Sequence, residues 1–212
     1  MSKKKPEVNA NTFVKSYWNY FLELEQQLLD IRRYVDFNSK NNNTFSMEFL
    51  KLLQAACSEI DVVAKIIDGY AYSDFDGGTI AKWGYYLQLL FPDLNKKTVI
   101  FNDDYSIQPW GKWELIKVVR TDKNGKQITT HKLKDKFKHP QWWTAYNKSK
   151  HERTSPYNNS NINYNRANLK NVVNAFAALY IIETLFYNYI CNQEKIDIKI
   201  IPSKLFSLIE NK

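Results

Sequence analysis

Apolar residues recur three and four positions apart along most of the chain, which is the spacing of amphipathic helices. The first such segment covers about residues 12–34, and a polar, Asn-rich stretch at 38–44 ends it. Ser46 has the side chain of an N-cap and predicts a second helix that continues to about residue 67 and ends at Asp68. Because the connection is short, we expect the two helices to run antiparallel.

The second half of the chain is also mainly helical in pattern. A shorter helix is expected at 79–90, another begins at Pro140, and a long apolar helix covers about 165–192. The tail alternates over 196–201 as a short strand would, and a last half-helix is expected from Pro202 onward.

A β-ribbon interrupts this helical pattern at about residues 98–134. Strand-like segments lie at 98–101, 113–121 and 127–133, and the last two flank an Asn124-Gly125 turn, a strong hairpin signal. The sequence therefore predicts a mainly α fold. We expect an antiparallel bundle of four main helices in a single domain, residues 1–212, with a β-hairpin inserted between the second and third main helices.

Composition agrees with a globular intracellular protein. Hydrophobic residues make up 44% of the chain, and no apolar run reaches the ~18–20 residues of a membrane span. The basic start, residues 1–13, lacks the apolar core of a secretory signal, so we expect a cytoplasmic protein that contacts no membrane. Cys57 and Cys191 fall inside apolar helical patterns and are expected to be buried free thiols. Three His and no Cys/His cluster predict neither a metal site nor another cofactor.

The positive charge is concentrated in one stretch, residues 110–153. Twelve basic and four acidic residues give this stretch a net +8, which equals the formal charge of the whole chain. The basic residues are Lys112, Lys117, Arg120, Lys123, Lys126, Lys132, Lys134, Lys136, Lys138, Lys148, Lys150 and Arg153. Such a field attracts RNA or DNA, although a solvated basic surface has the same composition.

The end of the helix that begins at Pro140 carries the side chains best suited to catalysis or phosphate binding. Asn147 and His151 are four residues apart and share a helical face, with Lys148, Lys150 and Arg153 around them. An imidazole can take a proton from a ribose 2′-hydroxyl, a guanidinium can stabilise charge on phosphate, and an amide can position it. We therefore predict His151, Arg153 and Asn147 as catalytic candidates, with Lys148 and Lys150 binding nucleic acid. Ordinary exposed side chains are the alternative interpretation.

Two further segments could support this site. Glu59, between Ala56 and Ile60, is expected to face inward and to orient His151 or Arg153, because a carboxylate among apolar residues needs a partner. On the ribbon, Lys117 and Arg120 could neutralise phosphates while Trp110 and Trp113 stack bases. The alternative is a hairpin packed on the helices with a solvated basic tip, and Trp142-Trp143 is interpreted as core.

Three segments resemble the HEPN superfamily of prokaryotic helical bundles, which occur in toxin–antitoxin, abortive-infection and CRISPR-linked systems. They are Cys57-Ser-Glu-Ile-Asp-Val-Val-Ala-Lys65, Ala145-Tyr-Asn-Lys-Ser-Lys-His-Glu-Arg153 and Ala167-Asn-Leu-Lys-Asn-Val-Val-Asn-Ala-Phe-Ala-Ala-Leu-Tyr180. Ribonucleases of this family carry an Arg, a polar residue and a His between their last two helices. By this resemblance Asn147 matches the polar residue and His151 the histidine.

The chain departs from the family pattern at the arginine, which should lie five to seven residues before His151. Thr144, Ala145 and Tyr146 occupy those positions, so Arg153 would have to fill the role in space. The resemblance implies a homodimer, in which Arg153 of one chain could approach His151 of its mate.

Three functions follow as hypotheses. The first is a metal-independent endoribonuclease of prokaryotic defence or stress response, and the second a non-catalytic module that binds nucleic acid or a nucleotide. The third is a domain that binds an acidic protein partner, and an antitoxin or other protein partner is compatible with any of them.

Overall fold

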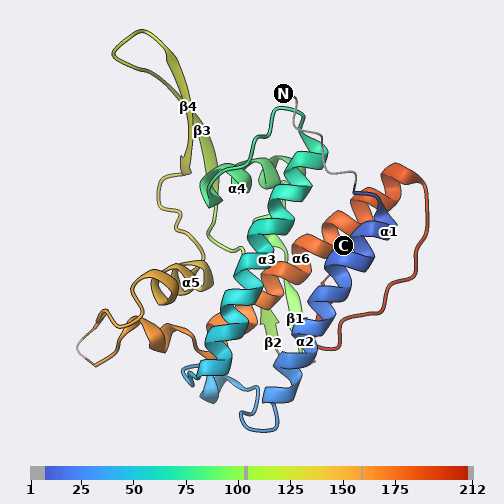
Figure 1. Ribbon diagram of the computed structural model, residues 1–212, viewed down its shortest axis with the longest axis vertical. Helices are drawn as coiled ribbons and strands as arrows, with labels where there is room; N and C mark the ends of the chain where they lie inside the picture. The colour runs from blue at the N-terminus through green and yellow to red at the C-terminus, as the bar shows by residue number, and fades with distance from the viewer. Residues whose placement is uncertain (1–7, 103–104, 159, 210–212) are drawn as a thin grey trace.

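Helices make up most of the regular structure in the computed structural model, which describes residues 8–102, 105–158 and 160–209 (Figure 1). The α-helices are α1 (Ala10–Phe13), α2 (Asn19–Ile31), α3 (Met47–Ala71), α4 (Ile80–Leu90), α5 (Gln141–His151) and α6 (Leu169–Glu194). A π-helical segment, Val14–Trp18, joins α1 to α2, so the first predicted helix is continuous. The prediction of a mainly α fold is confirmed. The basic start of the chain, residues 1–7, lies outside the described residues.

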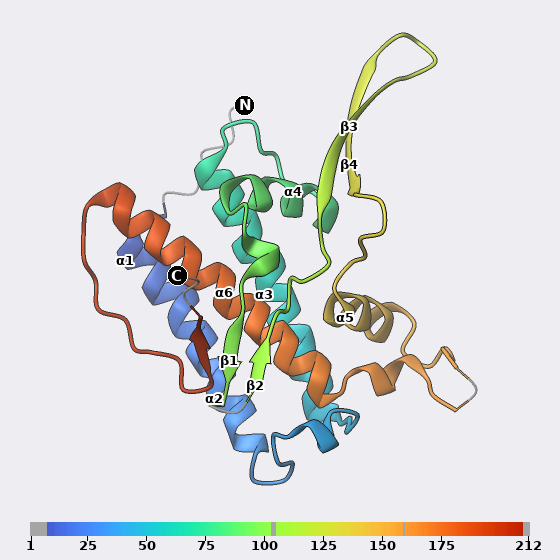
Figure 2. The same ribbon diagram turned by 180° about the vertical axis from the view of Figure 1, so that it is seen from behind.

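The two longest helices form the centre of the molecule. Helix α2 and helix α3 are joined by the loop at the lower end of Figure 1, and α6 crosses behind α3. In the view from behind, a small sheet lies in front of α6 (Figure 2). Ser46 caps α3, since its Oγ accepts a hydrogen bond from the backbone N–H of Phe49 at 3.1 Å.

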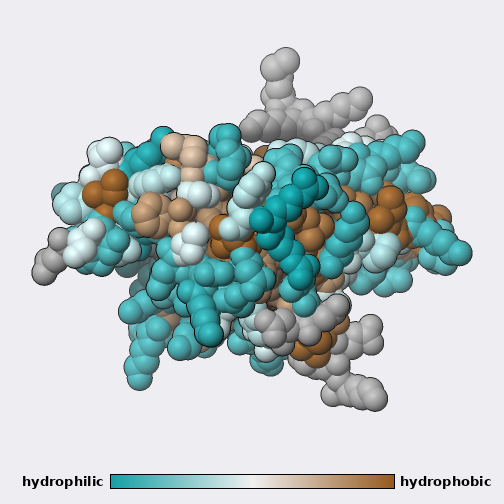
Figure 3. Space-filling view, turned by 90° about the horizontal axis from the view of Figure 1, so that it is seen from below, coloured by the Kyte–Doolittle hydropathy of each residue, from teal (hydrophilic) through white to brown (hydrophobic). Residues whose placement is uncertain are grey.

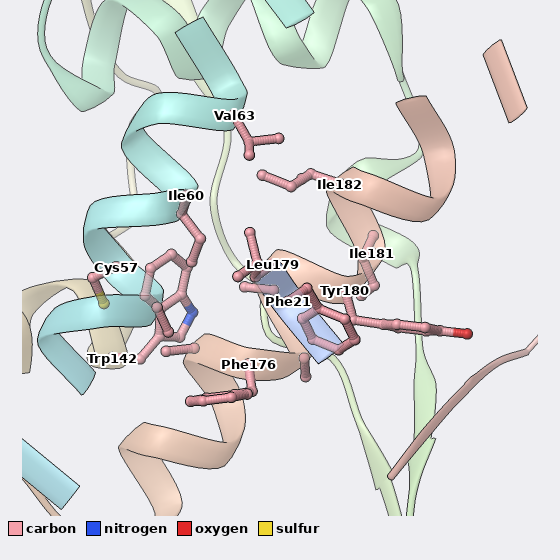
Figure 4. Close-up of a cluster of buried hydrophobic side chains, with 14 of the residues drawn as sticks. Phe21, Cys57, Ile60, Val63, Trp142, Phe176, Leu179, Tyr180, Ile181 and Ile182 are labelled. Carbon is pink, nitrogen blue, oxygen red and sulfur yellow. The ribbon is translucent and has the colours of Figure 1, made fainter. Parts of the chain in front are cut away.

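Helix α5 is attached to this centre by its tryptophans. Trp142 lies beside Cys57 of α3 and Phe176 of α6 in the buried cluster of Figure 4, and its indole N–H donates to Pro109 O at 2.9 Å. Trp110 and Trp113 are fully buried as well, with their rings stacked at 4.9 Å. Burying side chains of this size stabilises the fold by about 2–3 kcal/mol each. The tryptophans are therefore core residues and do not form an exposed base-stacking platform.

The strands form two separate units. Strands β1 (Val99–Phe101), β2 (Tyr105–Ile107) and β5 (Phe206–Leu208) make an antiparallel sheet in the order β2-β1-β5. Strands β3 (Leu115–Thr121) and β4 (Gln127–Leu133) pair as an antiparallel hairpin, close to the predicted positions.

The ribbon of β3 and β4 projects away from the helices in both views (Figures 1 and 2). Its turn is held by Asp122, whose Oδ1 accepts from the backbone N–H groups of Asn124 and Lys126, each at 2.8 Å. Gly125 has a φ of +78°, which explains the glycine in this turn. The base of the ribbon packs on α4, where the His131 ring lies 4.7 Å from that of Tyr85.

Two predictions for the tail are wrong. Residues 196–201 form no strand, and the expected half-helix after Pro202 is replaced by β5. The reason is a tertiary contact: the buried carboxylate of Glu25 accepts backbone N–H bonds from Lys204 at 2.9 Å and Leu205 at 3.1 Å. These bonds hold the tail extended beside β1. Helix α3 also continues four residues beyond its predicted end, to Ala71.

The two cysteines and the most apolar helix are both largely buried. Cys57 and Cys191 are buried free thiols, as predicted. Within the described ranges, only α6 is long and apolar enough to cross a membrane, and 72% of its most apolar window is buried inside the protein. The face seen from below in Figure 3 is mostly hydrophilic, with hydrophobic residues in small patches. Helix α6 is therefore explained as the core helix of this fold.

Candidate nucleic-acid interface

The last turn of α5 gathers the predicted site residues at the surface. The helix ends at His151, where the Glu152 N–H donates to Lys148 O at 2.9 Å. Lys148, Lys150 and His151 all lie in this last turn, where the negative end of the helix dipole favours cations. The sequence places them there because Trp142, Trp143 and Tyr146 occupy the buried face of the same helix.

Two of the three catalytic candidates donate hydrogen bonds to backbone carbonyls of α5. The Asn147 side-chain amide donates to Trp143 O at 3.2 Å, and Nε of the exposed Arg153 donates to Ser149 O at 3.3 Å. Arg153 thus covers a free carbonyl at the C-terminal end of α5. Its terminal guanidinium nitrogens, for which the described ranges hold no protein acceptor, stay available for a phosphate.

His151 is exposed, and in the described part of the chain no hydrogen bond or ion pair engages its ring. Nearby, the Lys148 ammonium lies 2.8 Å from a Glu152 carboxylate oxygen, an exposed pair worth a few tenths of a kcal/mol. The Lys150 ammonium lies 5.2 Å above the centre of the Tyr146 ring. This exposed surface therefore carries several cations and one imidazole that a polyanion could contact.

A second arginine joins this end of α5 through the following loop. Asn163 donates from its side chain to Glu152 O at 2.9 Å and accepts from Nε of Arg166 at 2.8 Å. The Arg166 guanidinium lies 3.9 Å from the centre of the half-exposed Tyr157 ring. Arg166 was not predicted as a site residue, because it lies thirteen residues beyond Arg153, in a short 3-10 helix (Asn163–Arg166) whose position no local pattern predicts.

Glu59 lies in a different environment. The side chain is half-buried on α3, and burial raises its pKa above the ordinary value. Burial, and to a smaller extent the charge of Glu59, raise the pKa values of Tyr17 and of the fully buried Glu183, so these two groups are electrostatic neighbours of Glu59. No hydrogen bond or ion pair in the described ranges connects Glu59 with His151 or Arg153. The hypothesis that Glu59 orients either residue therefore has no supporting contact.

The ribbon carries a separate group of cations. Lys117 and Arg120 are exposed on β3, away from the end of α5 (Figure 1). Of the twelve basic residues of the 110–153 stretch, two have ion pairs in the described structure: Lys134 with Glu114, and Lys148 with Glu152. The other ten are not neutralised by a described carboxylate. The positive charge seen in the sequence is therefore also present as an uncompensated surface field.

No side chains gather here in the way a metal site requires: within the described ranges, no three His, Cys, Asp or Glu residues could hold one ion together. Comparison of the chain with protein-family models, with curated proteins and with solved structures finds no match in any of the three.

Proposed function

We propose that this chain is a cytoplasmic, HEPN-like four-helix-bundle protein that binds single-stranded RNA on the cationic end of α5. The observation that carries the proposal is the uncompensated charge: ten of the twelve cations in the 110–153 stretch lack a carboxylate partner in the described structure. At the end of α5, Lys150 and Arg153 stand next to His151 on an exposed surface.

Single-stranded RNA suits this surface better than a duplex read by its bases. A flexible strand can place its phosphates against Lys150 and Arg153, and a base could stack on the half-exposed Tyr157 ring. The ribbon, with Lys117 and Arg120, would add phosphate contacts farther along the strand. Because these are contacts to backbone and ring faces, we expect little sequence preference.

We also propose a homodimer, which the resemblance to the HEPN superfamily implies. Two chains facing each other across the ends of their α5 helices would bring two sets of cations to one RNA. Light scattering coupled to size-exclusion chromatography measures this directly, and a monomer at working concentration would refute the dimer without affecting RNA binding.

The test of RNA binding is a mobility shift at physiological salt with a fluorescent single-stranded RNA. Replacing Lys150 and Arg153 together with Gln should weaken binding at least about tenfold, since each charge-assisted contact is worth about 1.5–3 kcal/mol. Lys15→Gln with Lys199→Gln is the matched control, because both lysines are exposed and lack a described ion pair. Lys15 lies on the π-helical segment before α2 and Lys199 in the extended tail after α6, and both segments lie away from α5 (Figure 1). No shift with the unmodified chain would instead favour an acidic protein partner.

Metal-independent RNA cleavage is the second candidate function, and the exposed, unengaged ring of His151 favours it. In this reaction the 2′-hydroxyl loses its proton to the imidazole, and the 2′-oxygen attacks the adjacent phosphorus. The bond to the 5′-oxygen breaks, and that oxygen takes a proton from water. The products are a 2′,3′-cyclic phosphate and a 5′-hydroxyl end. Arg153 or Arg166 would stabilise the charge on the phosphorus-bound oxygens.

Cleavage is tested with excess EDTA and mass analysis of the RNA ends. His151→Asn should abolish the cyclic-phosphate product while RNA binding persists, and His131→Asn, on the ribbon, should cleave normally. Arg153→Lys and Arg166→Lys compared side by side would identify the arginine that assists. Cleavage that survives in His151→Asn would refute the assignment of His151, and binding without products would leave the RNA-binding proposal intact.

A further inference from the structure

The opposite end of α5 borders a cavity that is separate from the proposed RNA contacts. Three of the ten unpaired cations of the 110–153 stretch lie there: Lys112, Lys136 and Lys138. The cavity has a volume of about 560 Å³, within the range of small-ligand sites. Three parts of the chain line it: the segment before β3, the segment between β4 and α5, and the first turns of α6. Helix α5 has 11 residues, so at about 1.5 Å per residue the cavity lies about 15 Å from His151.

Four lysines from these three segments converge on the cavity: Lys112, Lys136, Lys138 and Lys170. No Asp or Glu lines it, and in the described ranges none of the four ammonium groups has an ion-pair partner. All four lysines are exposed, and their positive potentials add at the cavity. The cavity therefore favours a multiply charged anion.

The backbone around the cavity adds to the positive field. Pro140, Gln141 and Trp142 line it, so it lies at the N-terminal end of α5, where no side chain caps the free N–H groups. Lys170 lies in the first turn of α6, where the helix dipole disfavours a cation. No acidic residue occupies the first turn of either helix.

Two of the four lysines also have an unusual backbone conformation. Lys112 and Lys136 have φ values of +59° and +70°, a region that lysine seldom adopts. The Lys138 N–H donates to Lys112 O at 3.2 Å, which ties the two segments together. His139, between Lys138 and α5, has a buried Nδ1 without a described hydrogen-bond partner. The fold thus holds the backbones of Lys112, Lys138 and His139 close together at the cavity.

We propose that this cavity is a phosphate-binding site that takes the terminal phosphate groups of a nucleotide or of an RNA 5′ end. Lysine ammonium groups and the free N–H groups of a helix N-terminus are the donors that phosphate oxygens use. The side-chain amides of Gln141 and Asn171 at the rim could bind the attached sugar. The site is distinct from the RNA surface at the other end of α5 and does not depend on it.

The experiment is isothermal titration of the full chain, in buffer without phosphate, using inorganic pyrophosphate as the probe. The test variant is Lys136→Gln with Lys138→Gln. The matched control is Lys123→Gln with Lys126→Gln at the exposed ribbon tip, which removes the same charge away from the cavity. We expect pyrophosphate affinity to fall at least about tenfold in the test variant and to stay unchanged in the control. Thermal unfolding of all three chains checks that they remain folded.

Two further titrations distinguish the sources of the phosphate. Adenosine triphosphate without magnesium represents a free nucleotide, and an RNA decamer with either a 5′-phosphate or a 5′-hydroxyl represents an RNA end. A preference for the phosphorylated decamer that disappears in the cavity variant assigns the site to RNA ends. Triphosphate binding without such a preference assigns it to free nucleotides. No pyrophosphate binding, or an equal loss in both variants, would overturn the proposal.

Discussion

Asp68 provides the clearest link between the fold and a measurable property. Its carboxyl group lies inside the protein near the end of α3, and neither oxygen has a hydrogen-bond partner in the described structure. Burial penalises the charged form and raises the pKa of Asp68 from its ordinary value of 3.8 to about 9. The folded protein therefore keeps this proton at neutral pH, whereas the unfolded chain releases it.

The consequence is a stability that falls as pH rises. Between the unfolded pKa of 3.8 and the folded pKa of about 9, the folded state binds one proton more than the unfolded state. The free energy of unfolding then decreases by about 1.4 kcal/mol per pH unit, or about 4 kcal/mol from pH 5 to pH 8. The stabilising contribution is complete below pH 3.8 and is lost progressively up to pH 9. Glu183 acts in the same direction, because burial and the charge of Glu59 raise its pKa.

Asp68→Asn removes the titration while keeping the size of the side chain. Urea unfolding at pH 5, 6, 7 and 8 should give a dependence on pH that is shallower by about 1.4 kcal/mol per unit than in the unmodified chain. The comparison of slopes cancels the constant cost of burying the new amide. Asp135→Asn, at an exposed position, is the control and should keep the original slope. An identical slope for Asp68→Asn and the unmodified chain would show that Asp68 titrates normally and would refute the reasoning.

Two other changes test the packing that positions the site. Gly84→Ala should lower the free energy of unfolding by about 1–3 kcal/mol, because the new methyl would lie 2.4 Å from the Trp113 ring. Urea unfolding measures this loss. The control is Gly69→Ala, where the new methyl would have no neighbour within 4 Å in the described structure and the change should be neutral or stabilising. Glu25→Gln replaces the carboxylate that accepts from the Leu205 N–H with an amide that can present a donor instead. Backbone hydrogen exchange in β5 should therefore accelerate. Unchanged exchange in β5 would show that Glu25 does not keep residues 203–208 in place.

The long elements could be predicted because their information is local. Helices α3 and α6 carry apolar residues at helical spacing over more than six turns, and Ser46 and Asn168 cap them. Of the three-residue strands, β1 lies within the strand predicted at 98–101, whereas β2 and β5 were not predicted. Strand β5 pairs with β1, about a hundred residues earlier, and no pattern within either strand indicates the partner.

The candidate sites show the same division between local and distant information. His151 and Arg153 are two residues apart, so the sequence alone predicts that they share the end of α5. Arg166 reaches that end only through Asn163, and Lys170 joins the cavity only because α6 begins beside α5. The sequence also could not decide whether Trp110 and Trp113 are buried or exposed, because their burial depends on packing against α4 and α5.

The most direct test of RNA binding at the end of α5 is the dependence of affinity on salt. For single strands, the slope of log K against log salt concentration is about −0.7 for each phosphate neutralised. Replacing Lys150 and Arg153 with Gln should make the slope shallower by about 1.4, while the Lys15 and Lys199 double variant should keep the slope of the unmodified chain. Equal slopes for all three chains would show that these cations do not contact the RNA, and would contradict the account.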